Sequence, residues 1–434
     1  MALAAPTDDR YLRRLLWLLL PAAFFNGFDG QLRALLLPDI QHTFGVSVAT
    51  LGIANIPIAA GQFVAFASIR ASDRIGRRPL LLVSLLGYTV FTALTATSWS
   101  IWSFVVFQFF VNVFLGTEYA MAVLVLSEEV DPARRGRTLG KLLIAGPLGA
   151  IVTAAMLGVH ADKTELGWRL FYLVSLLPVV FVLLARRALR ETRAFNAGTG
   201  TRRPGAPWLR ESFEAWKRPW RDRVLGLGVV SFLQKIPVAA GAGWWVYYAE
   251  KQRHYSTTLV AIFLIAAYGI GTTGYYACGR AIDRFGRKPT AMVFLFLAGV
   301  LGAALFQTSN KPASFVLLLG SVFFGLGMSP ALSAFGAELF PTAIRAQASA
   351  WVGNGFANTG SLLGPALVGI LGDSRGLIGN VGDTVSLLTV FALAAVPVIY
   401  FALPETRGVA LDAGDPLSGP RRPRARSSGP PSPP

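Results

Sequence analysis

The sequence predicts an all-α integral membrane protein with twelve transmembrane helices in two pseudo-symmetric six-helix bundles. Three observations lead to this fold class: the composition, the number of long apolar stretches, and a charged peptide that occurs in both halves of the chain. Of the 434 residues, 53% are hydrophobic and only 15% are charged, whereas about a quarter of the residues of a soluble protein are charged. Such a composition is typical of membrane proteins.

Apolar stretches of about 20 residues, the length that a helix needs to cross a bilayer, recur along the whole chain. The predicted spans begin near Leu15, Thr50, Leu80, Ile101, Gly140 and Leu170 in the first half and near Val224, Thr257, Thr290, Pro312, Ala346 and Thr384 in the second. They divide the chain into a cytoplasmic N-terminus (1–14), a first bundle (15–189), a cytoplasmic linker (190–223), a second bundle (224–404) and a disordered cytoplasmic tail (405–434).

The first span is interpreted as a retained helix and not as a signal peptide. It carries Asp29 and Arg33 and continues without a small-residue cleavage pattern. The only cysteine of the chain is Cys278. An intrachain disulfide is therefore excluded, and we expect no metal site and no cofactor.

The net charge of +17 is distributed unevenly over this topology. With the N-terminus inside, 32 of the 40 Lys and Arg residues lie on the cytoplasmic side, and Arg33 and Lys235 lie within spans. The six on the outer side are Lys163, Arg169, Lys251, Arg253, Lys311 and Arg375. Because this pattern follows the positive-inside rule, we expect the charge to orient the chain and to contact anionic lipid, and not to bind nucleic acid.

The segment between the two bundles is strongly basic, with eleven Lys or Arg residues in 186–223. Its later part, PWLRESFEAWKRPWRDR, places Leu209, Phe213, Trp216 and Trp220 on one helical face. That pattern suits a helix in the lipid headgroup layer, and a partly disordered linker explains it equally well. The tail ends in SGPRRPRARSSGPPSPP, a composition that cannot build a core.

The charged peptide of the two halves reads IRASDRIGRRP at 69–79 and GRAIDRFGRKP at 279–289, 210 positions later. Both copies lie in the predicted cytoplasmic turn between the second and third helices of a half. Gly76 and Gly286 suit a tight reversal of the chain, and the prolines that follow suit the first turn of a helix. A tight turn that obeys the positive-inside rule therefore explains the glycines and arginines.

That interpretation does not explain the two aspartates, Asp73 and Asp283. A carboxylate in such a turn can accept bonds from arginines or lie at a helix N-terminus. If these contacts form in one conformation and break in another, the turn is a latch between the bundles. We favour the latch over the plain tight turn.

A second pair of segments, EEVDPARRGR at 128–137 and AELFPTAIRA at 337–346, supports the repeat. Each has a glutamate three residues before a proline and an arginine shortly after it. Two independent pairs at an offset of about 210 indicate a two-fold repeated membrane protein. The predicted latch comprises Asp73, Arg74, Gly76, Arg77, Glu129, Arg135, Gly279, Asp283, Arg284, Gly286, Arg287, Glu338 and Arg345.

Four ionisable residues lie within predicted spans: Asp29 and Arg33 in the first, Glu118 in the fourth and Lys235 in the seventh. Charges inside a membrane are expensive and usually functional. In the structural alternative, Asp29 pairs with Arg33 and Glu118 pairs with Lys235, and the pairs only hold the bundle together. We favour a functional role for Asp29, Glu118 and Lys235, and weigh both roles equally for Arg33.

The motifs resemble those of the major facilitator superfamily over nearly the whole chain. The residues that match its signature loop are Gly279, Asp283, Arg284, Gly286, Arg287 and Lys288. GWRLFYLVSLLP (167–178) and LPETRG (403–408) are similar to the sugar porter branch, and GTEYAMA (116–122) resembles the metabolite:proton symporters. The chain departs from these patterns at Ile69, where the signature has glycine, and in the fourth helix, which lacks the arginine of sugar porters.

The resemblance implies a central cavity lined by the first, fourth, seventh and tenth helices. The residues expected along the substrate and proton pathway are Asp29, Arg33, Gln108, Asn112, Glu118 and Lys235. It also implies secondary active transport of a small organic solute, such as an organic acid or a similar metabolite, by proton-coupled symport with alternating access. We expect a monomer in the inner or plasma membrane, with both termini cytoplasmic.

Three other functions are weighed against symport. A proton-antiport exporter would use the same parts, and a sensor could keep the fold without transporting. A membrane enzyme is disfavoured because His42, His160 and His254 all lie in predicted external loops and the chain has no phosphate-binding loop or nucleophile–base pair. The substrate stays open: Lys235 and Arg33 suit an anion, whereas Asp29 and Glu118 suit a cation or zwitterion.

Overall fold

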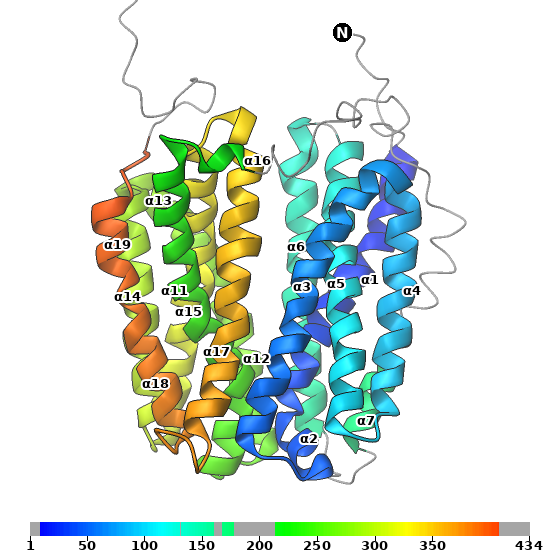
Figure 1. Ribbon diagram of the computed structural model, residues 1–434, viewed down its shortest axis with the longest axis vertical. Coiled ribbons are helices and arrows are strands. Elements are labelled where there is room, and N and C mark those ends of the chain that lie inside the picture. The colour runs from blue at the N-terminus through cyan, green and yellow to red at the C-terminus, as the bar shows by residue number, and fades with distance from the viewer. Residues whose placement is uncertain (1–8, 131, 160–166, 178–212, 408–434) are drawn as a thin grey trace, which may run out of the picture.

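The computed structural model describes residues 9–130, 132–159, 167–177 and 213–407. Within helices, it does not describe the side chains of 68–71, 73, 74, 127, 132–137, 139, 140, 143, 159, 342, 343 and 346. The described chain is helical, without strands, and folds into two bundles that stand side by side (Figure 1). This arrangement agrees with the predicted fold class.

The first bundle contains the helices of the N-terminal half. They are α1 (Asp9–Leu35), the short α2 (Leu37–Phe44), α3 (Val48–Ile75), α4 (Arg77–Ala96), α5 (Ile101–Glu129), α6 (Pro132–Val159) and α7 (Gly167–Val174). α1 begins within the segment assigned to the N-terminus. α7 is the described start of the sixth predicted span, whose continuation lies outside the described residues.

The second bundle repeats this order, but four of its spans are divided into shorter pieces. Its elements are η1 (Glu214–Trp216), α11 (Trp220–Tyr247), η2 (Tyr248–Gln252), α12 (Thr257–Gly271), α13 (Thr273–Phe285), α14 (Arg287–Gln307), α15 (Lys311–Glu338), α16 (Thr342–Ala350), η3 (Trp351–Ala357), α17 (Asn358–Gly372), α18 (Val381–Ala392) and α19 (Ala395–Ala402). The eleventh span contains a π-helical segment, η3, between α16 and α17. π-Turns of this kind often occur at functional sites.

Nine helical stretches in the described part of the chain are long and apolar enough to cross a membrane. Two further helices at predicted positions, α1 and α6, have 27 and 28 residues. The twelve predicted starts therefore each have a helix in the structure, if α7 is counted as the start of the sixth.

The ends of the helices differ between the two sides of the molecule. We call the side with the turns at Gly76 and Gly286 the basic end, and the side with the turns at Gly45 and Asp373 the opposite end. At the basic end, both glycines have a positive φ, 103° and 100°, which explains why the repeated turn needs glycine. Helices that start at the opposite end instead have side-chain caps, as at Ser100 for α5 and Asn310 for α15.

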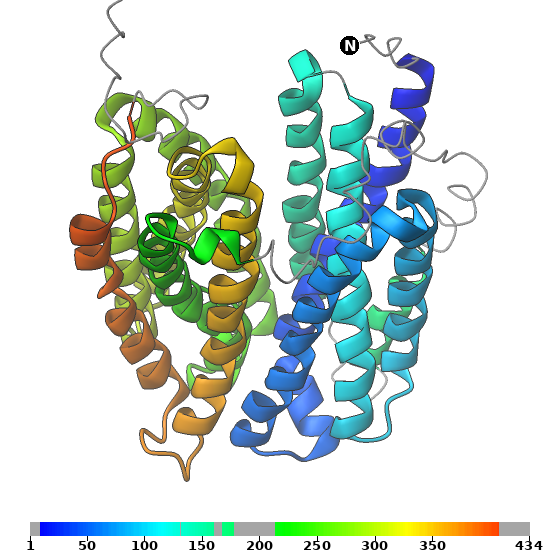
Figure 2. The ribbon, with the colours of Figure 1, turned by 45° about the horizontal axis from the view of Figure 1, so that its top comes forward.

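The hydrophobic core is continuous between the bundles only toward the opposite end. One cluster of buried residues there joins Leu32 and Leu51 of the first bundle to Trp244 and Phe263 of the second. Toward the basic end each bundle has a separate cluster, around Leu126 in the first and Phe335 in the second. Figure 2 shows the same arrangement, with the ribbons close together at the opposite end and apart at the basic end.

Polar contacts between the bundles follow the same asymmetry. Hydrogen bonds between described residues of the two bundles include Ala49 N to Asp373 Oδ2 (2.9 Å), Asn55 Nδ2 to the Leu362 carbonyl (3.3 Å), Thr258 Oγ1 to the Gly158 carbonyl (3.4 Å) and Tyr268 Oη to Gln31 Oε1 (3.3 Å). All lie toward the opposite end. The structure is therefore closed at the opposite end and open at the basic end.

The linker pattern is only partly described. Leu209 lies outside the described residues, and Phe213, Trp216 and Trp220 begin the second bundle. Trp216 packs on Trp351 of η3, with ring centroids 5.3 Å apart, so it contacts the bundle and not only lipid.

Candidate functional site

The four charges inside the spans do not form the two ion pairs of the structural alternative. Asp29 and Arg33 are on α1, Glu118 is on α5 and Lys235 is on α11. In the described part of the chain, no ion pair joins any two of them. Each of the four side chains instead has different neighbours.

Asp29 is buried inside the first bundle. The hydroxyl of Ser175, just after α7, donates a hydrogen bond to Asp29 Oδ1, and Asp29 Oδ2 is buried without a partner. Tyr172 on α7 lies within electrostatic reach of both Asp29 and Arg33. Arg33 Nη1 is also buried without a partner. The side chain of Asp29 therefore faces Ser175 at the end of α7, inside the first bundle, and not the space between the bundles.

Glu118 is fully buried as well. Asn26 Nδ2 donates to Glu118 Oε2 at 3.4 Å and to the Leu115 carbonyl at 3.0 Å. Glu118 Oε1 has no partner in the described part of the structure. Through the hydrogen bond from Asn26, Glu118 faces α1.

Tyr88 on α4 connects these two sites electrostatically. It is fully buried, and its hydroxyl has no hydrogen-bond partner among the described residues. It lies within electrostatic reach of both Asp29 and Glu118. We call Asn26, Asp29, Tyr88, Glu118 and Ser175 the buried carboxyl cluster. The cluster lies within the first bundle, which corrects the expectation that its carboxylates line the cavity between the halves.

The remaining expected pathway residues bond elsewhere. Gln108 Nε2 donates to Thr95 Oγ1 of α4 at 3.1 Å. Asn112 Nδ2 donates to the Gln108 carbonyl at 3.0 Å, and its Oδ1 accepts a hydrogen bond from Gln62 of α3 at 3.4 Å. No hydrogen bond in the described structure joins either residue to the cluster.

Lys235 is half-buried on the second bundle. Its Cβ faces the eleventh span, since a Cβ at Gly360 would lie 3.1 Å from it. No hydrogen bond or ion pair joins the ammonium group to a described residue. Lys235 therefore lies in the second bundle, whereas the buried carboxyl cluster lies in the first, and no described acidic residue pairs with it.

At the basic end, the repeated turn of the second bundle is held by an arginine–glutamate clamp. Arg287 binds both oxygens of Glu338, with Nε to Oε2 at 3.0 Å and Nη2 to Oε1 at 2.8 Å. Its Nη1 donates to the Ile282 carbonyl at 3.2 Å. Thr406, after the last helix, donates through Oγ1 to Glu338 Oε2 at 2.5 Å. The clamp therefore ties the turn to α15 and to the segment after α19.

Glu405 covers the start of α14 beside this clamp. Its oxygens accept the backbone N–H groups of Arg287 and Lys288 at 2.9 and 3.0 Å, and those of Thr406 and Arg407 at 3.0 Å. Partial burial raises the pKa of this carboxyl, but the four N–H donors together outweigh burial and hold its pKa below the usual range.

The first bundle has the same clamp, but it is built with Glu128 and not with the predicted Glu129. Arg77 Nη2 and Nε donate to Glu128 Oε1 at 3.2 and 3.4 Å, and Nη1 donates to the Ser72 carbonyl at 3.1 Å. Ser72, Arg77 and Glu128 each precede Ile282, Arg287 and Glu338 by 210 residues. Glu129 was predicted because it lies three residues before a proline, as Glu338 does. The residue 210 positions before Glu338 is Glu128, so a constant offset would have identified it.

The structure places the other predicted latch residues around these clamps. Asp283 has a side chain that is 78% exposed, with Oδ1 3.8 Å from Arg287 Nη1. Arg284 lies over the Phe285 ring, and Arg345 Nε donates to the Phe340 carbonyl at 3.2 Å. Gly279 has open space around it. The side chains of Asp73, Arg74 and Arg135 lie outside the described residues.

The family model of the Major Facilitator Superfamily matches residues 19–365 and 265–428. The chain belongs to the major facilitator superfamily. As a member of this family, it is a multi-pass membrane transporter of small metabolites and not an enzyme. The predicted fold class, twelve transmembrane helices in two bundles, is thereby confirmed.

Curated relatives of this superfamily member cover most of its length. It is 26% identical to "Probable 4-methylmuconolactone transporter" of Cupriavidus pinatubonensis, covering 89% of each chain. It is 25% identical to "Cis,cis-muconate transport protein" of Acinetobacter baylyi, over 87% of this chain and 92% of that protein. Among solved structures, an inward-facing, occupied bacterial homologue of the human lysosomal transporter Spinster shares the fold, with a TM-score of 0.75, 15% identity and coverage of 91% and 97% of the two chains.

Several residues of this superfamily member's site were not predicted from the sequence. Ser175 bonds to Asp29, Tyr88 and Tyr172 lie within electrostatic reach of the carboxylates, and Glu405 caps α14. Tyrosine and serine are ordinary within membrane helices, so no local signal distinguishes them. Only the packing of the helices brings them to the charges.

Proposed function

We propose that the protein is a secondary active transporter that carries a small organic acid together with a proton, by alternating access between the two sides of the membrane. The observation that supports this most is the buried carboxyl cluster. It contains two carboxyl groups, Asp29 and Glu118, each with one oxygen lacking a partner and neither paired with a described cation. Groups of this kind form proton relays in transporters.

Lys235 supports an anionic substrate in this proposal. It is a half-buried cation on the bundle opposite the carboxyl cluster, and no described acidic group neutralises it. A carboxylate that enters between the bundles from the basic end would find Lys235 as a partner. The names of the relatives, a methylmuconolactone transporter and a muconate transport protein, support small organic acids and related metabolites as substrates.

The clamps and turns supply the conformational part of the proposal. Each clamp joins residues within one bundle and can persist while the bundles move as rigid bodies. Asp283 is largely exposed in this state, which is open at the basic end, and so it is available to the other bundle when that end closes. Because the basic end carries most Lys and Arg residues, we assign it and both termini to the cytoplasm, in the inner or plasma membrane. We propose that the monomer is the working unit.

Proteoliposomes that contain the purified protein test the proposal. We expect uptake of labelled mono- and dicarboxylates to rise at least tenfold when a pH gradient, acidic outside, is imposed. Asp29→Asn should abolish accumulation against a gradient but retain counterflow exchange, which needs no net proton movement. Ser175→Ala is the matched control, since it removes the bond to Asp29 and keeps the carboxyl, and it should retain gradient-driven uptake.

Three outcomes would contradict parts of this proposal. If Asp29→Asn still accumulates substrate and Glu118→Gln does not, the proton carrier is on α5. If the gradient drives substrate out in exchange for protons, the protein is an antiporter. If no flux is seen with any solute, a sensor with the same fold replaces the transporter.

A further inference from the structure

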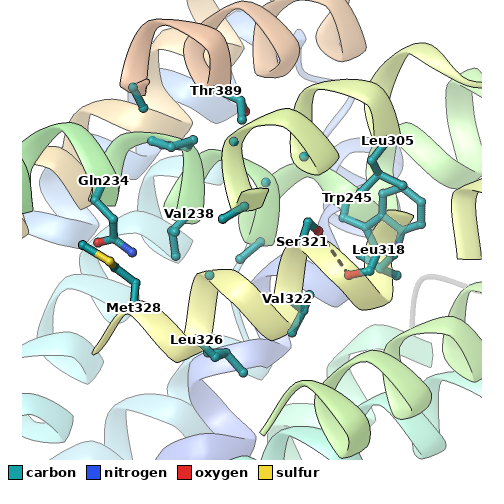
Figure 3. A pocket seen from close by; sticks show the side chains of 18 of the residues that line it. Gln234, Val238, Trp245, Leu305, Leu318, Ser321, Val322, Leu326, Met328 and Thr389 are labelled. Carbon is teal, nitrogen blue, oxygen red and sulfur yellow. Dashed lines mark hydrogen bonds between the residues drawn. The ribbon is translucent and has the colours of Figure 1, made fainter. Parts of the chain in front are cut away.

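The second bundle encloses a cavity of about 170 Å³ between α11, α12, α14, α15 and α18, next to Gln234 (Figure 3). Aliphatic and aromatic side chains form most of its wall. The hydroxyl of Ser321 donates to the Leu318 carbonyl at 3.1 Å, as Figure 3 shows, and that of Thr389 donates to the backbone of its own helix at 2.7 Å. Because these hydroxyls already have partners, the wall does not identify an occupant.

Two arginines of α13, in contrast, have free donors at the surface of the same bundle. Arg280 and Arg284 are exposed and lie one turn apart, on the face opposite the buried Cys278 and Ile282. Neither guanidinium group forms a hydrogen bond or an ion pair with a described residue. Like charges one turn apart on a helix repel each other, so an anion bound on this face would stabilise it.

An aromatic ring holds each of the two guanidinium groups. Arg280 Cζ lies 3.7 Å from the centroid of the Tyr276 ring, and Arg284 Cζ lies 5.2 Å from that of Phe285. A guanidinium group over a ring keeps its N–H donors for a second partner, and these donors match the oxygen atoms of a phosphate group. We call Tyr276, Arg280, Arg284 and Phe285 the arginine face of α13.

The arginine face is directed toward lipid. α12 and α13 form one continuous span, Thr257–Phe285, and Ile262, five turns before Arg280 on the same helical face, is 53% exposed. Because the bundles are closed near the start of this span, Ile262 faces lipid chains and not the gap between the bundles. The span has 29 residues, whereas about 20 cross the hydrocarbon. The two arginines near its last residue therefore lie at the level of the lipid headgroups.

We propose that the arginine face of α13 binds the headgroups of anionic phospholipids, with Arg280 and Arg284 as two separate contacts for phosphate. Tyr276 positions the guanidinium group of Arg280. An anionic lipid supplies the charge that the two arginines lack, and its acyl chains cover the apolar face that continues toward Ile262. This surface lies outside the buried carboxyl cluster and outside the cavity, so the proposal does not depend on transport.

Native mass spectrometry of the purified full-length protein in detergent tests the proposal with two lipids that have the same acyl chains. We expect phosphatidylglycerol, which has a net negative charge, to bind at least fivefold more tightly than zwitterionic phosphatidylcholine. Added salt should reduce this preference, because it screens exposed charges. Glycerol 3-phosphate, a headgroup without chains, should not displace the lipid. Displacement would identify a site for soluble phosphate and would overturn the lipid assignment.

Variants of the two arginines locate the binding. Arg280→Gln and Arg284→Gln should each weaken phosphatidylglycerol at least twofold and together at least fivefold, and unchanged binding of phosphatidylcholine shows that the variants are folded. Arg221→Gln is the matched control for charge, since Arg221 Nε already lies 3.4 Å from Asp222 Oδ1. Gly269→Leu is the control for apolar bulk on the same span, since a Cβ there meets no atom within 4 Å. Both controls should bind the two lipids like the wild type.

Tyr276→Leu tests whether the ring acts through Arg280. It should weaken phosphatidylglycerol less than Arg280→Gln does, and it should add nothing when the two changes are combined. The proposal is overturned if the wild type binds both lipids equally, if the double arginine variant keeps the preference, or if Arg221→Gln loses as much. Because binding is measured without flux, a failure here is distinct from a failure of the transport proposal.

Discussion

The two ends of the molecule hold the bundles by different means. At the opposite end, bare backbones meet: a Cβ at Gly52 would lie 2.6 Å from the Cα of Gly369, and Asp373 accepts the backbone N–H of Ala49 from the other bundle. At the basic end, each bundle is held by its own clamp, and charged side chains such as Asp283 face open space.

This difference indicates how the two ends would close. Glycine contacts between helices need no side-chain rearrangement and can separate and meet again as rigid surfaces. At the open basic end, the side chain of Asp283 is 78% exposed, and in the proposed latch it would bond to the other bundle only when that end closes. We therefore expect closure at the opposite end to depend on shape and closure at the basic end to depend on charge.

The largest effect, on access to the opposite end, is expected when the contact between Gly52 and Gly369 is blocked. A leucine at position 52 would meet backbone atoms, Gly369 Cα at 2.6 Å and the Ala366 carbonyl oxygen at 2.9 Å, which cannot move aside. Gly52→Leu should therefore open the opposite end. In a Cys278→Ser background, a cysteine at Asn55 should react with a water-soluble maleimide at least tenfold faster in this variant. Unchanged labelling, equal to that of Gly269→Leu, would show that side-chain volume at this contact does not control closure.

The two clamps offer the next comparison. Glu338 uses both oxygens, whereas the second oxygen of Glu128 is buried without a partner in the described structure. Removing an arginine leaves a largely buried glutamate without its cation, so Arg287→Ala should lower the free energy of unfolding by about 3 kcal/mol. Arg77→Ala should cost roughly half as much, because Arg77 bonds to only one oxygen of Glu128, whereas Arg287 bonds to both oxygens of Glu338. Chemical unfolding in detergent measures both, and equal losses would contradict the ranking.

Glu405 lies beside the clamp of the second bundle, and removing its charge should lower the free energy of unfolding less than removing a clamp arginine. Because this carboxylate is exposed and screened by solvent, Glu405→Gln should cost about 0.5–1 kcal/mol. Its pKa is lowered in the folded protein, so its contribution is complete above the ordinary glutamate pKa of about 4.3 and is lost as the pH falls through the lowered value. The melting-temperature difference from wild type should stay constant from pH 8 to 5 and shrink below about pH 4. A difference that changes between pH 8 and 6 would exclude this assignment.

Asp283→Asn should have the smallest effect on stability, within about 0.5 kcal/mol, because its side chain is 78% exposed. It should nevertheless slow transport severalfold with little change in substrate affinity, since a latch changes conformational populations. Asp222→Asn, another exposed aspartate at the start of α11, is the control for charge alone. Wild-type turnover in Asp283→Asn would leave only the tight-turn interpretation.

The fold was largely predictable, because helix length and the positive-inside rule depend on local composition. The predicted span starts at Ile101 and Thr257 coincide with the starts of α5 and α12. The turn glycines Gly76 and Gly286 were predicted from the need to reverse direction, and their positive φ values confirm it.

The site was less predictable, because rotation about a helix axis decides which neighbour a side chain meets. Asp29 and Arg33 lie one turn apart, yet Asp29 bonds to Ser175 in the sixth span. Both Glu118 and Lys235 lie within predicted spans, but Glu118 is on α5 of the first bundle and Lys235 is on α11 of the second. The cavity next to Gln234 has walls from five helices, so no single stretch of sequence contains its signal.

The constant offset of 210 has a consequence for the history of the chain. It relates Ser72, Arg77 and Glu128 to Ile282, Arg287 and Glu338, and it also relates the helix caps Ser100 and Asn310. Any unbalanced insertion or deletion after a gene duplication would have broken this register somewhere between the turn and the clamp. Surface loops normally accept such changes, so the preserved length indicates that the third and fourth spans of each copy were inherited as one unit of fixed size.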